Sequence, residues 1–127
     1  MKKTCLPLLI FLSASSVHAD EIKCNPSGSM IEMIKCAADE YQKNDKLLNE
    51  RYKIAMKKCD EYFPQNAKEC KNSLLKAQRN WSTYKESMHS YIYGFGPNGG
   101  GSLGRLEAAQ FLADETKKQA DLLNFNE

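Results

Sequence analysis

Residues 29–62 read SMIEMIKCAADEYQKNDKLLNERYKIAMKKCDEY, and this stretch predicts one long helix. Ser29 is followed three residues later by Glu32, which is the pattern of a capping box at a helix start. Apolar side chains then recur three and four residues apart along the whole stretch, as in an amphipathic helix. Pro64 cannot continue a helix, so we expect the helix to end before it, after roughly 50 Å.

The same apolar spacing returns after the turn. It predicts a second helix from about residue 66 to residue 93, which ends at the glycine-rich run GFGPNGGG, residues 94–101. Ser102 is the expected cap of a third helix over about 103–123. The sequence has no alternating strand pattern and no internal repeat. It therefore predicts an all-α fold, a long antiparallel helical hairpin with a third helix packed against it.

Residues 1–19 have the composition of a secretory signal peptide. Two lysines precede an apolar run, and residues 17–19 read VHA, a small-x-small cleavage site. The apolar run is shorter than the about 20 residues that span a bilayer. We therefore expect residues 20–127 to form one exported domain, periplasmic or secreted, with no integral membrane segment after signal removal.

The predicted mature chain has no net charge. The full sequence has 18 Lys and Arg and 16 Asp and Glu, and removal of Lys2 and Lys3 leaves the two classes equal. This balance argues against a nucleic-acid-binding protein, which normally carries a basic excess. It also argues against an acidic decoy for a cationic partner, unless the charge is unevenly distributed.

Four cysteines follow the predicted cleavage site: Cys24, Cys36, Cys59 and Cys70. An even number in an exported chain indicates disulfides, for which three pairings are possible. If Cys59 faces Cys70 across the turn, apolar positions of the first two helices oppose each other, and this agreement favours that pair. Cys24 then folds back onto Cys36. A zinc site is the alternative, but the chain has no C-x-x-C motif.

Polar residues interrupt the apolar stripes of the first two helices and form, with one tryptophan, a predicted polar layer: Asp45, Asn49, Gln78, Arg79, Trp81 and Lys85. The structural interpretation is a hydrogen-bonded layer that aligns the helices, with Asp45 paired to Lys85. The functional interpretation is a binding site. The structural interpretation is favoured because inward polar groups usually have structural partners.

The same residues carry a resemblance to a known family. The patterns DxxLNxxY at 45–52 and AQRxWxxYK at 77–85 resemble those of the LprI-like lysozyme inhibitors, a family of exported bacterial domains. Cys24, Cys36, the glycines at 99–101 and Thr116 fit the same resemblance, which covers nearly the whole mature chain. It implies an exported helical protein that inhibits lysozyme-like hydrolases.

The chain also departs from the family pattern. Lysine stands at position 85, where the family usually has arginine, which weakens a bidentate pair with Asp45. Cysteines that the family often has near positions 88 and 109–110 are absent, so we expect no bridge between the second and third helices. An arginine expected near position 119 is also absent. These differences predict a third helix that is held more loosely than usual.

The sequence offers little for catalysis. His89 is the one histidine after the predicted cleavage site, and no nucleophile elbow accompanies it. No metal-ligand spacing appears, and the glycine-rich run lacks the lysine and hydroxyl residue of a phosphate-binding loop. We therefore expect a non-enzymatic protein without catalytic residues, metal or cofactor.

The glycine-rich run and its neighbouring aromatic residues are the predicted binding surface: Tyr91, Tyr93, Phe95, Asn98, Gly99 and Gly100. Aromatic residues are common interface anchors. The alternative is a helix connector whose aromatic side chains pack on the hairpin. The resemblance implies a protein partner, a lysozyme-like cell-wall hydrolase. Residues 93–102 of this chain would enter and block the cleft of that enzyme.

Two other functions remain open. One is a periplasmic binding or immunity protein for another toxin or envelope protein, and the other is a small structural or stress-response protein. The zero net charge counts against the inhibitor hypothesis, because it implies weak electrostatic attraction to a basic lysozyme.

Overall fold

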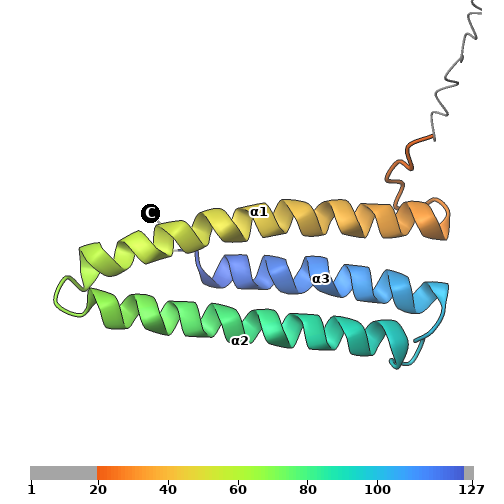
Figure 1. The fold of residues 1–127 in the computed structure, drawn as a ribbon. Helices are drawn as coiled ribbons and strands as arrows, with labels where there is room; N and C mark the ends of the chain where they lie inside the picture. Colours follow the sequence, from red (N-terminus) through yellow and green to blue (C-terminus); the bar gives the residue numbers. More distant parts are fainter. Residues whose placement is uncertain (1–19, 125–127) are drawn as a thin grey trace, which may run out of the picture.

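The computed structural model describes residues 20–124 as three helices joined by short connections (Figure 1). Helix α1 spans Met30–Tyr62, α2 spans Ala67–Gly94 and α3 spans Ser102–Leu122. These bounds confirm the three predicted helices to within one residue at each end, and they confirm the all-α fold. The predicted signal peptide lies outside the described residues. Within residues 20–124, no helix combines the length and the apolar character that crossing a membrane requires.

Helix α3 lies between the two arms of the hairpin (Figure 1). It packs most extensively against α1 and less against α2, and α1 and α2 contact each other least. The buried apolar side chains of α1 and α3 are mainly alanines, and small side chains let two helices approach closely: Ala37 and Ala55 in α1, and Ala108, Ala113 and Ala120 in α3. The third helix therefore separates much of α1 from α2, which changes the partners of several polar side chains.

The hydrophobic core is small and lies where all three helices meet. Leu48 of α1, Ala120 of α3 and the adjoining Leu123 form its buried centre. Partly buried side chains from α1 and α2 pack around this centre: Leu47, Tyr52, Leu74 and Trp81. A domain of this size buries a limited fraction of its surface, so covalent staples and polar contacts contribute a large share of its stability.

Two polar side chains of α1 hold α3 in place. The buried Asn44 donates from Nδ2 to the carbonyl oxygen of Ala113 at 3.0 Å. Arg51 donates to the carbonyl oxygen of Ala120 at 2.9 Å and forms an ion pair with Asp121 at 3.0 Å. These contacts tie α3 to α1 without the cysteines that are absent from this chain.

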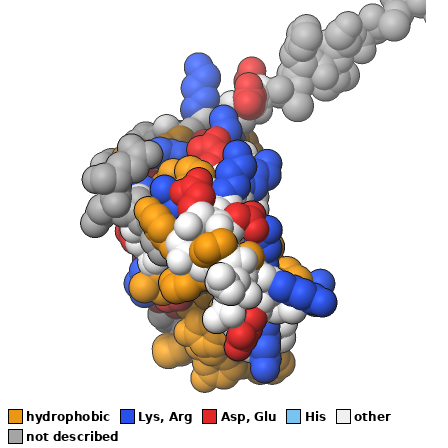
Figure 2. Space-filling view, turned by 90° about the vertical axis from the view of Figure 1, so that its left-hand side faces the viewer, with side chains coloured by type: hydrophobic (Ala, Val, Ile, Leu, Met, Phe, Trp, Pro, Cys, Tyr) orange, Lys and Arg blue, Asp and Glu red, His pale blue; other side chains and the backbone are white. Residues whose placement is uncertain are grey.

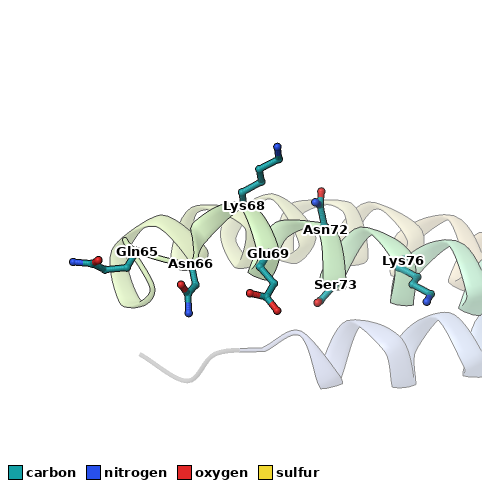
Figure 3. Close-up of a pocket in the computed structure, with 7 residues that line it drawn as sticks. All are labelled: Gln65, Asn66, Lys68, Glu69, Asn72, Ser73 and Lys76. Atoms are coloured by element: carbon teal, nitrogen blue, oxygen red, sulfur yellow. The ribbon is translucent and has the colours of Figure 1, made fainter.

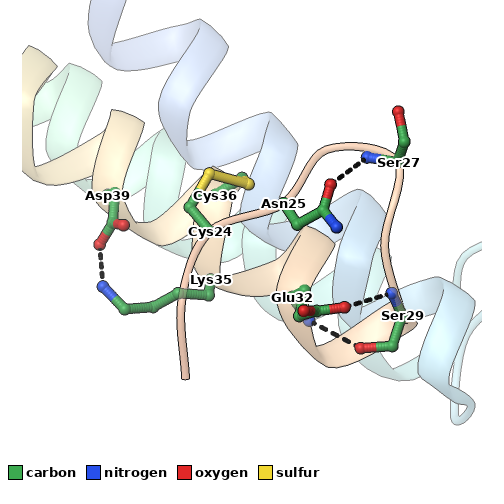
Figure 4. Close-up of a disulfide and its surroundings, with 8 residues drawn as sticks. All are labelled: Cys24, Asn25, Ser27, Ser29, Glu32, Lys35, Cys36 and Asp39. Carbon is green, nitrogen blue, oxygen red and sulfur yellow. Dashed lines mark hydrogen bonds and ion pairs between the residues drawn. A yellow bond between two sulfur atoms is a disulfide. The ribbon is translucent and has the colours of Figure 1, made fainter. Parts of the chain in front are cut away.

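Both predicted disulfides form. Cys24 is bonded to Cys36 with a Cα–Cα distance of 4.6 Å, and Cys59 is bonded to Cys70 with a Cα–Cα distance of 5.7 Å. The first bond holds the segment that precedes α1 against that helix (Figure 4). The second joins the last turn of α1 to the first turn of α2 and closes the hairpin.

The predicted capping box starts α1 beside the first disulfide (Figure 4). The Ser29 side chain accepts a hydrogen bond from the backbone N–H of Glu32 at 3.4 Å, and the Glu32 carboxylate accepts one from the backbone N–H of Ser29 at 2.6 Å. The backbone N–H of Ser29, and then its side chain, lower the pKa of Glu32 below its ordinary value. The ionised form of Glu32 therefore contributes to the helix start.

Candidate functional site

Residues 94–101, called the glycine loop below, fold compactly between α2 and α3. The backbone N–H groups of Phe95 and Gly96 donate to the carbonyl oxygen of Tyr91 at 2.7 and 2.8 Å. The backbone N–H of Gly100 donates to the carbonyl oxygen of Tyr93 at 2.9 Å. The loop is therefore fixed by its own backbone hydrogen bonds, and these bonds define where its side chains project.

Glycine is needed at two positions of this loop. Gly100 has a φ of 78°, a left-handed conformation that side-chain-bearing residues rarely adopt. A Cβ atom added at Gly99 would lie 2.6 Å from the backbone nitrogen of Phe95. Asn98 ties the loop to α3, because its Nδ2 donates to the Glu107 carboxylate at 2.8 Å. Three of the predicted binding residues thus hold the shape of the loop.

The aromatic residues of the predicted binding surface are exposed. Phe95 is 82% exposed, and about half of Tyr91 and of Tyr93 is open to solvent. The ring of Tyr93 lies 6.1 Å from that of His89, one turn earlier on α2. Phe95 is therefore largely free of the helices, whereas the two tyrosines are partly covered. Their role in binding stays a prediction.

The start of α3 adjoins the glycine loop and has no side-chain cap. The cap predicted at Ser102 is wrong, because Gly101 has the extended backbone of a cap residue, with φ −123° and ψ −178°, and Ser102 is the first helical residue. The first turn of α3 also contains no acidic residue. N–H groups at a helix start attract anions, and Ser102 and Leu103 of this first turn are exposed, whereas Gly104 is buried against the backbone of Asn98 and Gly99.

The predicted polar layer does not form as one unit. Lys85 is buried at 6% exposure, and its Nζ donates to the hydroxyl of Tyr41 at 3.1 Å. The same ammonium lies 4.8 Å from the ring centre of Trp81 and 5.2 Å from that of Tyr41. Asp45 instead accepts a hydrogen bond from Asn49 at 3.4 Å. The predicted Asp45–Lys85 pair is therefore wrong, and sequence reasoning missed Tyr41, which lies one helical turn before Asp45.

The remaining members of the predicted layer lie elsewhere. Gln78 of α2 accepts a hydrogen bond from Gln119 of α3 at 3.1 Å. Gln119 stands at the position where the family pattern has an arginine. The side chain of Arg79 is exposed. Gln78 differs from the prediction because α3 lies between much of α1 and α2, so this side chain meets α3 and not α1.

A shallow depression of about 450 Å³ lies at the start of α2, and polar side chains line it: Gln65, Asn66, Lys68, Glu69, Asn72, Ser73 and Lys76. Figure 3 shows that these side chains point in different directions and do not converge on one point. Binding sites for small ligands usually combine an enclosed apolar wall with converging polar groups. The depression lacks that arrangement. Across residues 20–124, no group of three or more His, Cys, Asp or Glu side chains could hold a metal ion.

Contacts between the helices divide the molecule into two ends. Asn44 contacts Ala113, and Tyr41 contacts Lys85, so a plane across α1 after Asp45 crosses α3 near residue 114 and α2 near residue 81. The loop end, which carries the glycine loop, comprises residues 20–45 and 82–114. The hairpin end, which carries the α1–α2 turn, comprises residues 46–81 and 115–124.

The two ends have opposite charge. The loop end has nine Asp and Glu against five Lys and Arg, whereas the hairpin end has eleven Lys and Arg against six Asp and Glu. The balanced net charge of the mature chain therefore conceals a strong charge separation along its length. The zero net charge predicted weak attraction to a cationic partner. The acidic loop end nevertheless attracts such a partner, because its local charge is negative.

The chain matches a known family over nearly all of its described length. Residues 23–123 match the family described as lysozyme inhibitor LprI, which is a family of inhibitors and not of enzymes. The matched range contains the glycine loop, both disulfides and both sequence patterns on which the resemblance rests. No curated protein and no solved structure matches the chain.

Proposed function

Because this chain belongs to the LprI family of lysozyme inhibitors, we propose that its glycine loop enters the cleft of a lysozyme-like hydrolase and blocks it. The observation that carries this proposal is a loop held by its own backbone, from which Phe95 projects at 82% exposure. Hydrolases of this class cleave glycosidic bonds with two carboxyl groups that flank the scissile bond. A fixed loop that reaches these groups excludes the substrate.

The rigidity of the loop favours tight binding. A flexible loop loses conformational freedom when it binds, and each ordered side chain costs about 0.5–1.5 kcal/mol. The hydrogen bonds from Phe95, Gly96 and Gly100 already hold this backbone in one conformation. The exposed rings of Tyr91, Tyr93 and Phe95 then supply the kind of anchor that dominates many interfaces.

The start of α3 offers a partner for a catalytic carboxylate. Its first turn has neither a side-chain cap nor an acidic residue, so its N–H groups are suited to an external anion. The nearby Glu107 is already engaged by Asn98. A carboxylate of the enzyme would complete the helix start and lose its catalytic role in the same contact.

The charge of the loop end supports approach to a basic enzyme. Its excess of acidic side chains directs an attractive field toward a cationic partner, although the whole chain is neutral. Complementary charge mainly raises the association rate and helps to orient the encounter. Aromatic contacts and the start of α3 would then determine how long the complex lasts.

The test is a titration of the oxidised protein, residues 20–127, into c-type lysozyme acting on cell walls. We expect a saturable loss of activity near one equivalent. The double variant Tyr93→Ala/Phe95→Ala should inhibit at least about tenfold more weakly, because interface anchors often contribute about 2 kcal/mol or more each.

The matched control is Tyr62→Ala/Phe63→Ala, which removes a similarly exposed aromatic pair at the hairpin end. Its inhibition should equal that of the unmodified protein. Full lysozyme activity in the presence of excess protein would contradict the proposal. That result would favour a periplasmic binding or immunity protein for another target, to be sought by pull-down from periplasmic extract.

A further inference from the structure

The hairpin end carries a second exposed aromatic pair. Tyr62 and Phe63 are 59% and 55% exposed, and they lie at the turn between α1 and α2, beyond the end of α3 (Figure 1). The adjacent Pro64 is also exposed. The disulfide between Cys59 and Cys70 lies directly beneath this tip and holds its two helices together. The pair is therefore presented at an end of the molecule that the disulfide holds together.

Lysines without acidic partners lie along the two helical arms that lead to this tip. Four exposed lysines of residues 53–76 have no ion pair with any residue that the structure describes: Lys53, Lys57, Lys68 and Lys76. Two of the three carboxylates in the same stretch are engaged, Asp60 by Lys71 at 2.7 Å and Glu61 by Lys58 at 3.2 Å. Glu69 is the third. The tip therefore presents a marked excess of positive charge.

Figure 2 views the molecule from the hairpin end. Hydrophobic side chains run through the centre and lower part of this view, and Lys and Arg side chains lie mostly along its right-hand margin. The Nζ of Lys58 also lies 5.1 Å from the ring centre of Tyr62, so aromatic and cationic groups are in contact at the tip. Apolar rings bordered by cationic groups match the two layers of a membrane surface, the acyl boundary and the anionic headgroups.

We propose that the hairpin end docks on an anionic phospholipid bilayer. The rings of Tyr62 and Phe63 enter the interface, where tyrosine is enriched in membrane proteins and where phenylalanine buries apolar surface. The lysines keep their charged heads at the level of the lipid phosphates while their alkyl stems cover apolar surface. The acidic loop end points away from the anionic surface, so the glycine loop stays accessible in solution.

A bilayer fits this tip better than the other occupants. A second copy of the chain would need roughly 800 Å² of complementary surface on each partner, and the turn itself offers two large exposed apolar side chains, Tyr62 and Phe63. A soluble polyanion would account for the lysines but would leave the exposed rings without a function. A bilayer uses both features, and its headgroup charge is complementary to the lysines.

The test is co-sedimentation of the oxidised protein, residues 20–127, with vesicles of phosphatidylcholine that contain or lack phosphatidylglycerol. We expect binding to the anionic vesicles alone, and we expect added salt to weaken it. The variant Lys53→Gln/Lys57→Gln/Lys68→Gln/Lys76→Gln should lose this binding, because each lysine near an anionic surface contributes about fivefold in affinity. Tyr62→Ser/Phe63→Ser should weaken the binding at least about tenfold.

Matched controls lie at the loop end. Lys23→Gln/Lys43→Gln removes two exposed lysines and Tyr91→Ser/Phe95→Ser removes two exposed rings, and neither variant should change vesicle binding. Circular dichroism and the melting temperature report whether each variant has folded. Lysozyme inhibition is measured without vesicles, so the failure of either proposal leaves the other intact.

Four results would overturn the membrane proposal. The first is absent or equal binding to the two kinds of vesicle. The second is an unchanged affinity of the four-lysine variant. The third is full binding by Tyr62→Ser/Phe63→Ser, which would indicate simple adsorption of a cation. The fourth is self-association in sedimentation velocity that these variants abolish, without vesicle binding, which would indicate a second copy of the chain.

Discussion

At the scale of single residues, the environment of Lys85 is the least expected feature of the protein. Its buried ammonium has a phenol oxygen and two aromatic faces as partners, all from Tyr41 and Trp81. A cation held over aromatic rings away from solvent contributes about 2 kcal/mol. These partners do not require the planar fork of arginine, which is suited to carboxylates, so lysine is adequate at this position.

The substitution Lys85→Ala should lower the free energy of unfolding by about 2 kcal/mol, because it removes the cation from both rings. Urea denaturation measures this change. The fluorescence of Trp81, the one tryptophan of the chain, should also change, since the ammonium no longer lies over its ring. The control Lys46→Ala alters an exposed lysine and should stay within about 0.5 kcal/mol of the unmodified protein. Equal losses in the two variants would contradict the special role of Lys85.

At the scale of the helices, α1 is stapled close to both of its ends. Its start has the capping box and the Cys24–Cys36 bond, and its end has the Cys59–Cys70 bond. Beyond the end of α3, the hairpin has little core to hold it, so its closure depends strongly on the second disulfide. Both the glycine loop and the hairpin tip therefore project from rigid supports.

Removal of the second disulfide should destabilise the protein by about 3 kcal/mol. The bond joins residues 11 apart, and closing a loop of that length restricts the unfolded chain by about this amount. Thermal unfolding of Cys59→Ser/Cys70→Ser measures the loss. A reducing agent should lower the melting temperature of the unmodified protein but not of a variant that lacks all four cysteines. An unchanged melting temperature on reduction would refute the stabilising role of the disulfides.

The capping box predicts a specific dependence of stability on pH. The hydrogen bonds from Ser29 lower the pKa of Glu32 from its ordinary value of 4.5. The ionised carboxylate therefore stabilises the folded protein above pH 4.5, and this contribution disappears as the pH falls through the lower pKa of the folded state. The variant Glu32→Gln should lose less stability than the unmodified protein between pH 5 and pH 3, as measured by the melting temperature. Parallel curves for the two proteins would contradict this assignment, and Glu21→Gln, which changes an exposed carboxylate before α1, is the matched control.

At the scale of the whole molecule, the charge separation distinguishes the two ends for which we propose different partners. The acidic loop end is suited to a cationic enzyme, and the basic hairpin end is suited to an anionic surface. Opposite fields at the two ends also orient the molecule before contact. If both proposals hold, a neutral chain binds two oppositely charged partners without a large field of one sign.

This separation predicts how inhibition depends on salt. The association rate with a basic lysozyme should fall as salt rises, because the Debye length is about 10 Å at 0.1 M and shortens further. The variant Glu40→Gln/Asp114→Asn removes two exposed carboxylates of the loop end and should slow association while dissociation stays unchanged. The control Glu50→Gln/Glu69→Gln removes two exposed carboxylates of the hairpin end and should not slow association. Equal slowing by both variants would show that the location of the charge is unimportant.

Local sequence signals were sufficient for the helices and for the disulfides. Apolar spacing, the box formed by Ser29 and Glu32, Pro64 and the glycine run placed every helix boundary within one residue. Signals of this kind involve residues three or four apart, so they can be recognised in the sequence before the fold is known. The pairing of Cys59 with Cys70 was also accessible, because a short turn limits which residues of two adjoining helices can meet.

Tertiary packing determined what the sequence pattern left undefined. Apolar spacing indicates that one face of a helix is buried, but it does not indicate which helix covers that face. The prediction paired α1 with α2, whereas α3 covers much of that face. Gln78 therefore meets Gln119 of α3, whereas Lys85 still reaches α1 but meets Tyr41, one helical turn before Asp45, because of the register in which the two helices pack. The charge separation has the same origin, because antiparallel helices bring together charges that are distant in sequence. Linear composition averages those charges to zero, whereas packing sorts them to opposite ends.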